Sequence, residues 1–311
     1  MFIVTGGAGF VGSNLVRELN RRGHTDILVV DNLTHSEKAR NLADLIVSDY
    51  MDKREFRTRL DAGTLDLRAE AVFHNGACSD TMESDGRYMM ENNYGDSKAL
   101  LHWCLARKTP LVYASSAATY GTSTSFEPAP GNERPLNVYG YSKLAFDQHV
   151  RSLMPAIQSP VVGLRYFNVF GPREHHKGRM MSVLHQLLRQ LKDAGVCRLF
   201  RGTDGFGDGE QQRDFIYVSD VVSINLHFSG GDMVKGIMNA GTGRARSFND
   251  IAKALIAHLG GGRIDYIPFP DELRGKYQSF TQADVRSLRA AGYGAPFTEL
   301  EVGIAATLAD L

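Results

Sequence analysis

Short apolar runs alternate with helical patterns along the first half of the chain. Within each run the apolar residues follow one another instead of occupying every second position. This continuity is typical of parallel strands, which are buried on both faces. The order strand, helix, strand, helix therefore predicts an α/β fold built on a doubly wound parallel sheet. The predicted strands are 2–6, 27–31, 45–49, 71–77, 111–116 and 161–168, with helices such as 12–22 and 86–107 between them.

The pattern changes after Gly171 and Pro172. Strand signals become sparser and loops become longer, as in the glycine-rich stretch 201–212. A later helical pattern has Ser247 and Asn249 as alternative N-caps. We therefore predict a smaller α/β lobe, interleaved with segments that return to the first part. The predicted boundaries are 1–167 plus about 214–240 for the larger domain, and 168–213 plus about 241–311 for the lobe.

Charge and cysteine content exclude several classes of protein. The 311 residues carry 35 Lys and Arg against 35 Asp and Glu, so no broad basic surface is available for nucleic acid. No apolar run is long enough to span a bilayer, and no basic stretch precedes the first apolar segment, so we expect neither membrane association nor a signal peptide. The widely spaced Cys78, Cys104 and Cys197 form neither a metal-binding pair nor a disulfide framework. We expect a cytoplasmic protein without a metal site.

The stretch TGGAGFVGSNL follows the first predicted strand and opens the first helix. Its glycines at Gly6, Gly9 and Gly12 permit a tight turn, close approach of backbone amides to a pyrophosphate, and packing of helix on sheet. Asp31 ends the second strand nineteen residues after Gly12, where an acidic residue can reach a ribose hydroxyl. This context predicts a Rossmann-type dinucleotide site in which the helix N-terminus faces the negative charge.

The choice between NAD and NADP stays open at this stage. Asp31 suits the ribose 2′-hydroxyl of NAD, whereas Asn32 and the cations Lys38 and Lys53 suit the 2′-phosphate of NADP. On the residues alone, the two lysines are better interpreted as ordinary surface lysines. The small residues of NGACS (75–79) let a cofactor lie across the strand ends.

The stretch NVYGYSK contains a candidate catalytic pair. Tyr139 stands four residues before Lys143, a spacing that places both on one face of a helix. A phenol with a pKa near about 10 is a poor base at neutral pH, and a neighbouring ammonium favours the phenolate. Ser115 and Ser116 end the fifth strand, where a serine can hydrogen-bond a reacting oxygen. This set predicts proton transfer by Tyr139, whereas Tyr141 points elsewhere and packs.

The charged stretch REHHKGRM, residues 173–180, leaves several interpretations open. It could ligate a metal, bind a phosphate, form a solvated loop or hold a catalytic base. Adjacent histidines such as His175 and His176 are poor chelators on regular structure, and no carboxylate–histidine set accompanies them, which argues against a metal. On this stretch alone, a solvated basic loop is the favoured interpretation.

These motifs together resemble the extended short-chain dehydrogenase/reductase family. The resemblance runs nearly end to end, through MFIVTGGAGFVGSNLVRELN, FHNGACS, YASSAATYG, PLNVYGYSK and RYFNVFGPREHHKG. The later stretch YIPFPDELRGKYQSFTQADVRSLRAAGY is much more specific than the glycine motif. It is similar to the nucleotide-sugar epimerases that act on ADP-heptose.

The resemblance implies an epimerase that serves lipopolysaccharide core synthesis by inverting C6 of an ADP-heptose. In such enzymes tightly held NADP takes a hydride from C6 and returns it to the other face of the ketone. A carbon attacked from both faces needs a proton acceptor on each side, and the resemblance gives these roles to Tyr139 and Lys177. It further implies that Lys143 holds the tyrosine and the nicotinamide ribose, and that Ser116 binds the substrate oxygen. We expect desolvation or nearby cations to lower the pKa of Lys177; the candidate neighbours are Arg173, His175, His176 and Arg179.

The resemblance also implies binding residues, position by position. It assigns NADP to the larger domain, the ADP-heptose substrate to the smaller lobe, and a homo-oligomer, a pentamer, to the assembly. For the cofactor it implies Gly6, Gly9, Phe10, Val11, Gly12, Asp31, Asn32, Lys38, Lys53, Asn75, Gly76, Ala77, Cys78, Ser79, Asn92, Lys143 and Val169. For the substrate it implies Ser116, Asn168, Arg179, Gln186, Phe200, Arg201, Gly202, Thr203, Arg213 and Tyr277. Arg213 has a physical reason of its own, since a guanidinium binds a diphosphate through two parallel hydrogen bonds.

The chain departs from the family pattern at three places. Gln186 stands where the family often has histidine, and His185 comes one position earlier. The loop 203–212 is longer than expected before Arg213, and Arg179 occupies a position where a smaller residue is also seen. These departures concern the contacts to the heptose and leave the reaction unchanged.

The sequence leaves two alternative functions open. One is another nucleotide-sugar epimerase or a dehydratase of the family, although Ala117 and Ala118 stand where a dehydratase usually carries an acidic residue. The other is an NADP-binding regulator without catalytic activity, which would not need to keep Ser116, Tyr139 and Lys143 together.

Overall fold

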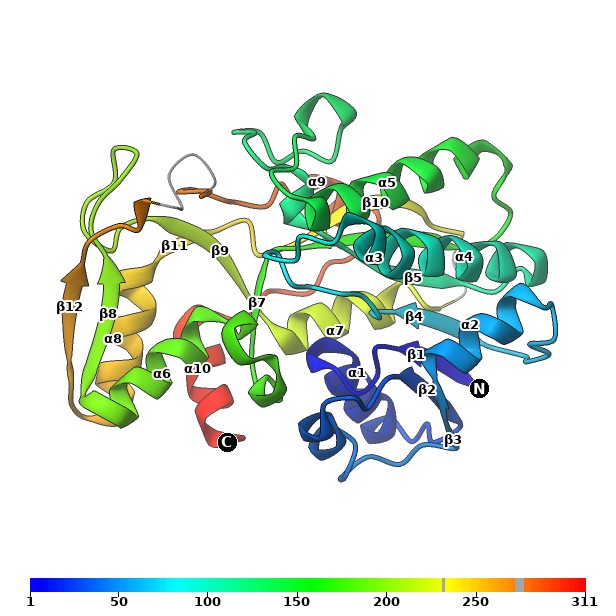
Figure 1. Cartoon of the computed structure of the whole chain (residues 1–311), viewed down its shortest axis with the longest axis horizontal. Helices are drawn as coiled ribbons and strands as arrows, with labels where there is room; N and C mark the ends of the chain where they lie inside the picture. The colour runs from blue at the N-terminus through cyan, green and yellow to red at the C-terminus, as the bar shows by residue number, and fades with distance from the viewer. Residues whose placement is uncertain (231–232, 272–276) are drawn as a thin grey trace.

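A seven-stranded parallel sheet forms the larger part of the computed structural model, which describes residues 1–230, 233–271 and 277–311 (Figure 1). The strand order is β10-β6-β5-β4-β1-β2-β3. Chain order reverses beside β1, which pairs with β2 on one side and with β4 on the other, so a crevice opens at the carboxyl ends of these strands. The strands are β1 (Phe2–Thr5), β2 (Ile27–Asp31), β3 (Asp49–Asp52), β4 (Ala71–His74), β5 (Leu111–Ser116), β6 (Val161–Tyr166) and β10 (Lys235–Ala240).

Helices cover both faces of this sheet, as the continuous apolar runs predict. On one face, Val4 and Val29 pack with Leu15 of α1 (Phe10–Arg21) and Val221 of α7 (Val218–His227). The other face carries α2 (Lys53–Asp61), α4 (Asp96–Arg107) and α5 (Val138–Leu153), which bury the alternate side chains of the same strands. The predicted doubly wound parallel sheet is therefore confirmed.

Two small sheets and three helices form the other part of the molecule, on the left in Figure 1. Apolar residues of α6, α8 and α10 share one core with strands of both small sheets. The smaller part comprises β7 (Asn168–Phe170), β9 (Gln212–Tyr217) and β11 (Ala245–Ser247) in one sheet, β8 (Val196–Phe200) and β12 (Arg263–Ile267) in the other, and α6 (Val183–Ala194), α8 (Phe248–Leu259) and α10 (Leu300–Ala309). The division into a cofactor domain and a substrate lobe stays a prediction. Residues 272–276, which belong to the predicted lobe and to the stretch YIPFPDELRGKYQSFTQADVRSLRAAGY, lie outside the described residues.

The chain crosses between the two parts more than once. It leaves the large sheet after β6, and returns through α7, which packs on α1, and β10, which pairs with β6. A further return places α9 (Arg286–Ala290) against β10. These crossings tie the two parts together on either side of the crevice.

Local sequence explains one helix start, and the structure corrects one strand. Ser247 caps α8: its side chain accepts from the backbone N–H of Asp250, whose carboxylate accepts from the N–H of Ser247 in return. The strand predicted at 45–49 is wrong, because β3 begins only at Asp49. Leu45 and Val47 pack against the core of the sheet from an irregular segment, since apolar residues can be buried without joining a strand ladder.

Neither a membrane span nor a metal cluster is found in the described part of the chain. None of its helices has the length and apolar character needed to cross a bilayer. No group of three or more His, Cys, Asp or Glu side chains among these residues is arranged to hold a metal ion.

Candidate functional site

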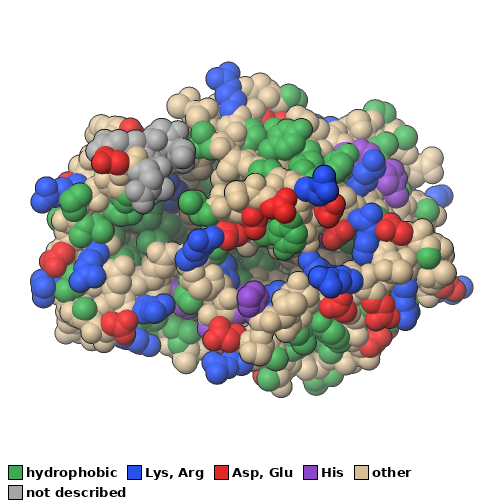
Figure 2. All heavy atoms as spheres, in the orientation of Figure 1, with side chains coloured by type: hydrophobic (Ala, Val, Ile, Leu, Met, Phe, Trp, Pro, Cys, Tyr) green, Lys and Arg blue, Asp and Glu red, His purple; other side chains and the backbone are tan. Residues whose placement is uncertain are grey.

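One cleft of about 1190 Å³ collects most of the residues singled out by the sequence. It runs from the carboxyl ends of the large sheet to the small sheets, and Figure 2 shows the surface hollowed in this region. All four proposed catalytic residues line it, as does every residue proposed for the cofactor. Of the residues proposed for the substrate, Ser116, Asn168, Arg179, Gln186, Phe200, Arg213 and Tyr277 line it as well.

The glycine-rich turn has the shape that a dinucleotide pyrophosphate requires. Gly6 adopts φ +68°, and a Cβ placed on Gly12 would lie 2.1 Å from the carbonyl oxygen of Gly6. Helix α1 starts at Phe10, and its N-cap Gly9 offers no side-chain oxygen to the first backbone amides. The turn therefore exposes a helix N-terminus to the cleft with no side chain in the way, which fits a bound phosphate group.

Asp31 ends β2 beside this turn and is already hydrogen-bonded on several sides. Its carboxylate accepts from the backbone N–H groups of Ala8 at 2.8 Å and Asn32 at 2.7 Å. Lys38 donates to the same carboxylate at 2.9 Å and approaches the side-chain oxygen of Asn32 at 3.2 Å. A lysine that is partly buried against Asp31 is not an ordinary solvated surface lysine, so this wall of the cleft offers both an acid and a cation.

Lys53 and Asn92 meet at the lining of the cleft. The ammonium of Lys53 donates to the side-chain oxygen of Asn92 at 2.5 Å. Asn92 belongs to a π-helical turn, Glu91–Gly95, that separates α3 (Gly86–Met90) from α4 within the single helix predicted at 86–107. Such turns widen a helix locally and often occur at functional sites. Here the turn presents Asn92 to the cleft and Asn93 to the interior.

A buried hydrogen-bond network supports the carboxyl ends of β1 and β4 behind the cleft. Ser97 donates to the carbonyl of Asn93 at 2.6 Å, so it accepts from Nε2 of His74 at 2.7 Å. The hydroxyl of Thr5 then donates to Nδ1 of His74 at 2.6 Å and accepts from the N–H of Gly76. Burial, together with the nearby Lys143 charge, lowers the pKa of His74 to about 3, so the ring is neutral and purely structural.

The side chain of Asn93 extends this network to the tyrosine helix. It exchanges two hydrogen bonds with the backbone of Cys78, at 2.8 and 2.9 Å. It also donates to the hydroxyl of Ser142 at 3.0 Å, which in turn donates to the carbonyl of Tyr139 at 2.7 Å. The loop after β4 and the first turn of α5 are therefore held at a fixed separation.

Tyr139 lies in the first turn of α5, which begins after Asn137 as N-cap. Burial raises the pKa of Tyr139, and its hydrogen bond with Ser116 opposes that rise. Lys143, one turn later, is 5% exposed and donates to the carbonyl of Ala114 at 2.8 Å. Burial lowers the pKa of Lys143 to about 8, although the carboxylate of Asp147 acts in the opposite direction. The structure thus brings a phenol, a hydroxyl and a cation together at the end of β5.

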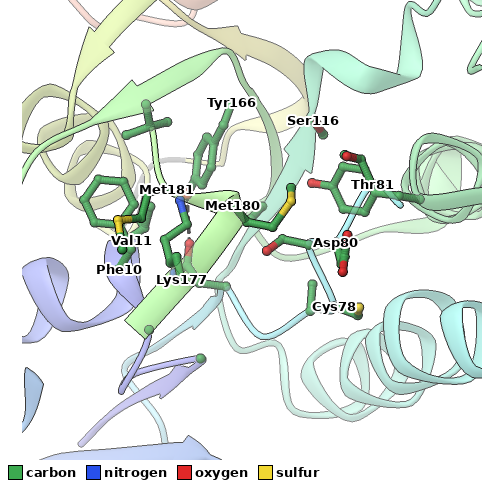
Figure 3. Close-up of a pocket in the computed structure, with 18 of the residues that line it drawn as sticks. Phe10, Val11, Cys78, Asp80, Thr81, Ser116, Tyr166, Lys177, Met180 and Met181 are labelled. Carbon is green, nitrogen blue, oxygen red and sulfur yellow. Dashed lines mark hydrogen bonds between the residues drawn. The ribbon is translucent and has the colours of Figure 1, made fainter. Parts of the chain in front are cut away.

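Lys177 approaches the cleft from the turn 175–180, which follows β7. Its ammonium lies 4.9 Å from the centre of the Phe10 ring and 3.1 Å from the carboxylate of Glu174. In the view of Figure 3 its side chain lies beside Phe10 and Met181, with Ser116 across the pocket. The amine is only partly exposed, with 22% of the side chain accessible, and faces the pocket instead of bulk solvent.

The surroundings of Lys177 differ from the cationic ones expected. The closest charged group is the carboxylate of Glu174, whereas Arg173 is bound to Asp44 and Arg179 donates to Asp80 at 2.6 Å. Burial lowers the pKa of His176 to about 4, so its ring carries no charge near neutral pH. Arg173 and Arg179 thus each pair with a carboxylate of their own, because sequence proximity does not decide which way each side chain turns. The expected influence of neighbouring charge on Lys177 stays a prediction.

Arg213 occupies the far end of the cleft, on β9. It is 7% exposed, and it forms no ion pair with any described carboxylate. Its guanidinium lies 4.7 Å from the ring centre of Tyr277 and 5.7 Å from that of Phe248, and it donates to the carbonyl of Gln212. Burial lowers the pKa of Arg213, which is the cost of holding a cation without a counter-charge. Such a site has the chemistry to receive an anionic group.

Three residues proposed for the substrate stand apart from the cleft. Arg201, Gly202 and Thr203 do not belong to its lining. Their loop is folded on itself, because Gly202 donates to Asp208 at 2.8 Å and the carbonyl of Arg201 accepts from Gln211 at 2.9 Å. The extra length of this loop is thus taken up by internal turns.

The register of α6 decides which of His185 and Gln186 faces the cleft. Gln186 lines the cleft and donates to the carbonyl of Met181 at 2.8 Å. His185 is buried and lies 2.6 Å from the carbonyl of Gly171, so it supports the loop from behind.

The cleft also contains polar residues that the sequence reasoning missed. Asp80 and Thr81 directly follow the NGACS stretch, so proximity to a recognised motif is a signal that could have found them. Gln190, Arg198 and Gln211 carry no such signal, because helix packing and strand pairing alone bring them to the lining.

Comparison with known proteins agrees with this geometry. The model of the NAD dependent epimerase/dehydratase family matches residues 2–241. The ADP-L-glycero-D-manno-heptose-6-epimerase of Alkalilimnicola ehrlichii is 59% identical over 304 residues, which cover 98% of this chain and 95% of the relative. The crystal structure of the Helicobacter pylori ADP-L-glycero-D-manno-heptose-6-epimerase is similar with a TM-score of 0.85 at 32% identity, covering 99% of this chain and 94% of that one.

A UDP-glucose 4-epimerase shows how far the likeness extends. The structure of the Thermotoga maritima enzyme with UDP-glucose is similar to this chain with a TM-score of 0.82 at 28% identity, covering 99% of this chain and 97% of that one. Because the family match spans most of the sequence and the Alkalilimnicola relative is similar over nearly all of it, the chain belongs to the NAD dependent epimerase/dehydratase family.

Proposed function

We propose that this protein is an epimerase that interconverts ADP-D-glycero-β-D-manno-heptose and ADP-L-glycero-β-D-manno-heptose by inverting C6. The high identity to a relative of that name, over nearly the whole of both chains, supports the substrate. The role in the pathway is to supply the heptose of the lipopolysaccharide core.

One observation carries the mechanism. The phenol of Tyr139 and the amine of Lys177 line the same cleft but come from different elements, α5 and the turn after β7. Inversion of a carbon through a planar ketone needs proton transfer on both faces. Two acid–base groups that reach one cleft from separate elements meet that requirement, whereas one tyrosine alone does not.

The bound nicotinamide dinucleotide supplies reversible hydride acceptance at C6. The chain's own residues handle the proton: Tyr139 takes it from the C6 hydroxyl of one epimer, and Lys177 takes it from the other. Lys143 stabilises the phenolate as a nearby cation, and Ser116 donates to the oxygen of the reacting carbon. At the far end Arg213 binds the diphosphate, with Tyr277 and Phe248 beside it.

The alternatives receive less support from the site. Ala117 and Ala118 follow Ser116, so the position at which a dehydratase usually carries an acid is apolar. An inactive regulator would not need a phenol hydrogen-bonded to a serine hydroxyl, with a buried lysine one helical turn away.

The defining experiment follows ADP-D-glycero-β-D-manno-heptose with the purified protein. We expect an equilibrium mixture of both C6 epimers by proton NMR, without net consumption of added cofactor. Binding of cofactor together with unchanged ADP-heptose would overturn the proposal, and conversion of UDP-glucose instead would favour a 4-epimerase.

For the cofactor we propose NADP in preference to NAD. Asp31 is already occupied by two backbone amides and by Lys38, so a ribose hydroxyl would have to compete for it. Lys38 and Lys53 can instead neutralise a 2′-phosphate. The replacement Lys38→Ala should weaken NADP binding about tenfold and leave NAD binding nearly unchanged. Lys192→Ala, at an exposed position of α6, is the matched control; equal losses for both cofactors would contradict the proposal.

Assembly and location follow the family resemblance. We propose a homo-oligomer, expected to be a pentamer, located in the cytoplasm where ADP-heptose is made. Light scattering of the purified protein measures the subunit number, and a monomer would contradict the assembly.

A further inference from the structure

Glu174 is a fully buried carboxylate next to the proposed second base. None of its side chain is accessible to solvent. One oxygen accepts from the ammonium of Lys177 at 3.1 Å and from the backbone N–H of Ser182 at 2.7 Å. The other oxygen has no hydrogen-bond partner within the described residues. Nothing in the family resemblance gives this residue a role.

Burial of a carboxylate is costly unless a cation compensates it. Within the described parts of the chain, Lys177 is the only lysine or arginine within ion-pair distance of Glu174. His185 stands farther away, 3.8 Å from the unpartnered oxygen, and lies close to the carbonyl of Gly171. Among the described residues, the amine of Lys177 is therefore the cation placed to compensate the buried carboxylate of Glu174.

The carboxylate also closes the turn that carries Lys177. The N–H of Lys177 donates to the carbonyl of Glu174 at 2.9 Å, and the N–H of Ser182, at the start of α6, donates to its carboxylate. Between them Gly178 adopts φ +52°, which reverses the chain direction. Glu174 thus sits inside the turn and holds both its backbone and its lysine.

We propose that Glu174 is the positioning residue of Lys177. Its carboxylate holds the amine on the cleft wall, against the face of Phe10, so that the amine meets the substrate in one orientation. The role of Lys177 as a base rests on the proposed function, but the coupling between Glu174 and Lys177 does not. A consequence is that Lys177→Met removes a base and at the same time leaves a buried carboxylate without its cation.

Melting temperatures of four proteins test the coupling: the unaltered chain, Lys177→Met, Glu174→Gln and the double variant. We expect Lys177→Met to lower the melting temperature by about 5 °C, because it leaves Glu174 uncompensated. The double variant should recover most of this loss, because a glutamine carries no charge and still accepts from Ser182. Strictly additive shifts in the double variant would overturn the proposal. These measurements need no substrate, so they stand even if the proposed function fails.

A second arm does not require any Glu174 variant to fold. Lys177→Arg keeps the cation and should keep the melting temperature within about 1 °C, in contrast with Lys177→Met. Equal losses in the two variants would mean that shape, and not charge, connects Lys177 to Glu174, and would overturn the proposal.

The positioning role has its own readout in the epimerisation assay. Glu174→Gln should lower kcat at least about tenfold, with KM and cofactor binding unchanged, because only the orientation of the amine is lost. Asp44→Asn is the matched control, since it removes the exposed carboxylate that binds the adjacent Arg173 and should leave kcat unchanged. An unaltered kcat in Glu174→Gln, or equal losses in both variants, would overturn the positioning role.

Discussion

Lys177 and Arg213 are cations of the same cleft, and they are held in opposite ways. Lys177 is partly exposed and paired with the buried carboxylate of Glu174. Arg213 is more deeply buried, and among the described residues it has aromatic faces and a backbone carbonyl as neighbours but no carboxylate. A cation that is paired with a carboxylate is held in one place. A buried cation without such a partner can still pair with an incoming anion.

In the proposed function, this difference separates the reacting end of the cleft, at Lys177, from its binding end, at Arg213. A base must keep one orientation towards the carbon, so a permanent partner is useful to Lys177. A guanidinium proposed to bind a diphosphate is best placed when it has no other ion pair to give up, and no described carboxylate pairs with Arg213. On this proposal, the desolvation cost of burying Arg213 is offset when the diphosphate binds.

The largest expected effect concerns the phenol that shares the reacting end with Lys177. Tyr139→Phe should lower kcat about 1000-fold, because the proton acceptor is lost, while cofactor affinity stays the same. Tyr141→Phe, two positions away and half exposed, is the control and should keep full activity. Steady-state kinetics with ADP-heptose measure both, and similar losses in the two variants would remove Tyr139 from the reacting end.

An intermediate effect is expected at the binding end. Arg213→Gln should raise KM for the ADP-heptose about 100-fold, because charge-assisted hydrogen bonds to the diphosphate are lost. Its melting temperature without ligand should stay the same or rise, in contrast with Lys177→Met, because an uncompensated buried charge disappears. Arg263→Gln, exposed on β12, serves as control. If Arg213→Gln lowered the melting temperature as far as Lys177→Met does, the proposed contrast between the two cations would be wrong.

The smallest effect is a pH dependence set by Lys143, a third cation of the cleft. Burial lowers the pKa of Lys143 to about 8, so its charge is present below that pH and is lost as the pH rises through it. Because the phenolate of Tyr139 depends on that charge, kcat/KM should fall on the alkaline side of about pH 8, approaching tenfold per pH unit. A profile that stays flat to pH 10 would show that Lys143 remains charged.

Much of the reacting end was predictable because its signals are local. The four-residue spacing of Tyr139 and Lys143 fixes their common face as soon as α5 forms. The glycine turn is equally local, because Gly6 and Gly12 meet within one strand–turn–helix unit. The apolar run at 45–49 misled the strand assignment, since an apolar residue at a sheet edge can pack without pairing.

The binding end was less predictable because long-range packing creates it. The loop from Arg201 to Thr203 looked suitable by position, yet internal hydrogen bonds keep it out of the cleft lining. That Arg213 pairs with no carboxylate in the described part of the chain is likewise invisible in the sequence, where Asp214 is its neighbour. Asp214 points the other way and accepts from Thr242, Gly243 and Ala283.

The sequence by itself determined the parallel sheet, the glycine turn and the tyrosine–lysine pair. These depend on periodicity and on spacings of a few residues, which the backbone geometry of strands and helices converts directly into position. Only the tertiary structure decided that Lys177 pairs with Glu174 and that Arg213 has no carboxylate partner within residues 1–230, 233–271 and 277–311. Which charges meet depends on how each side chain is turned once distant elements pack. Burial then raises the energetic cost of a charge without a partner and strengthens the interaction of a charge that has one.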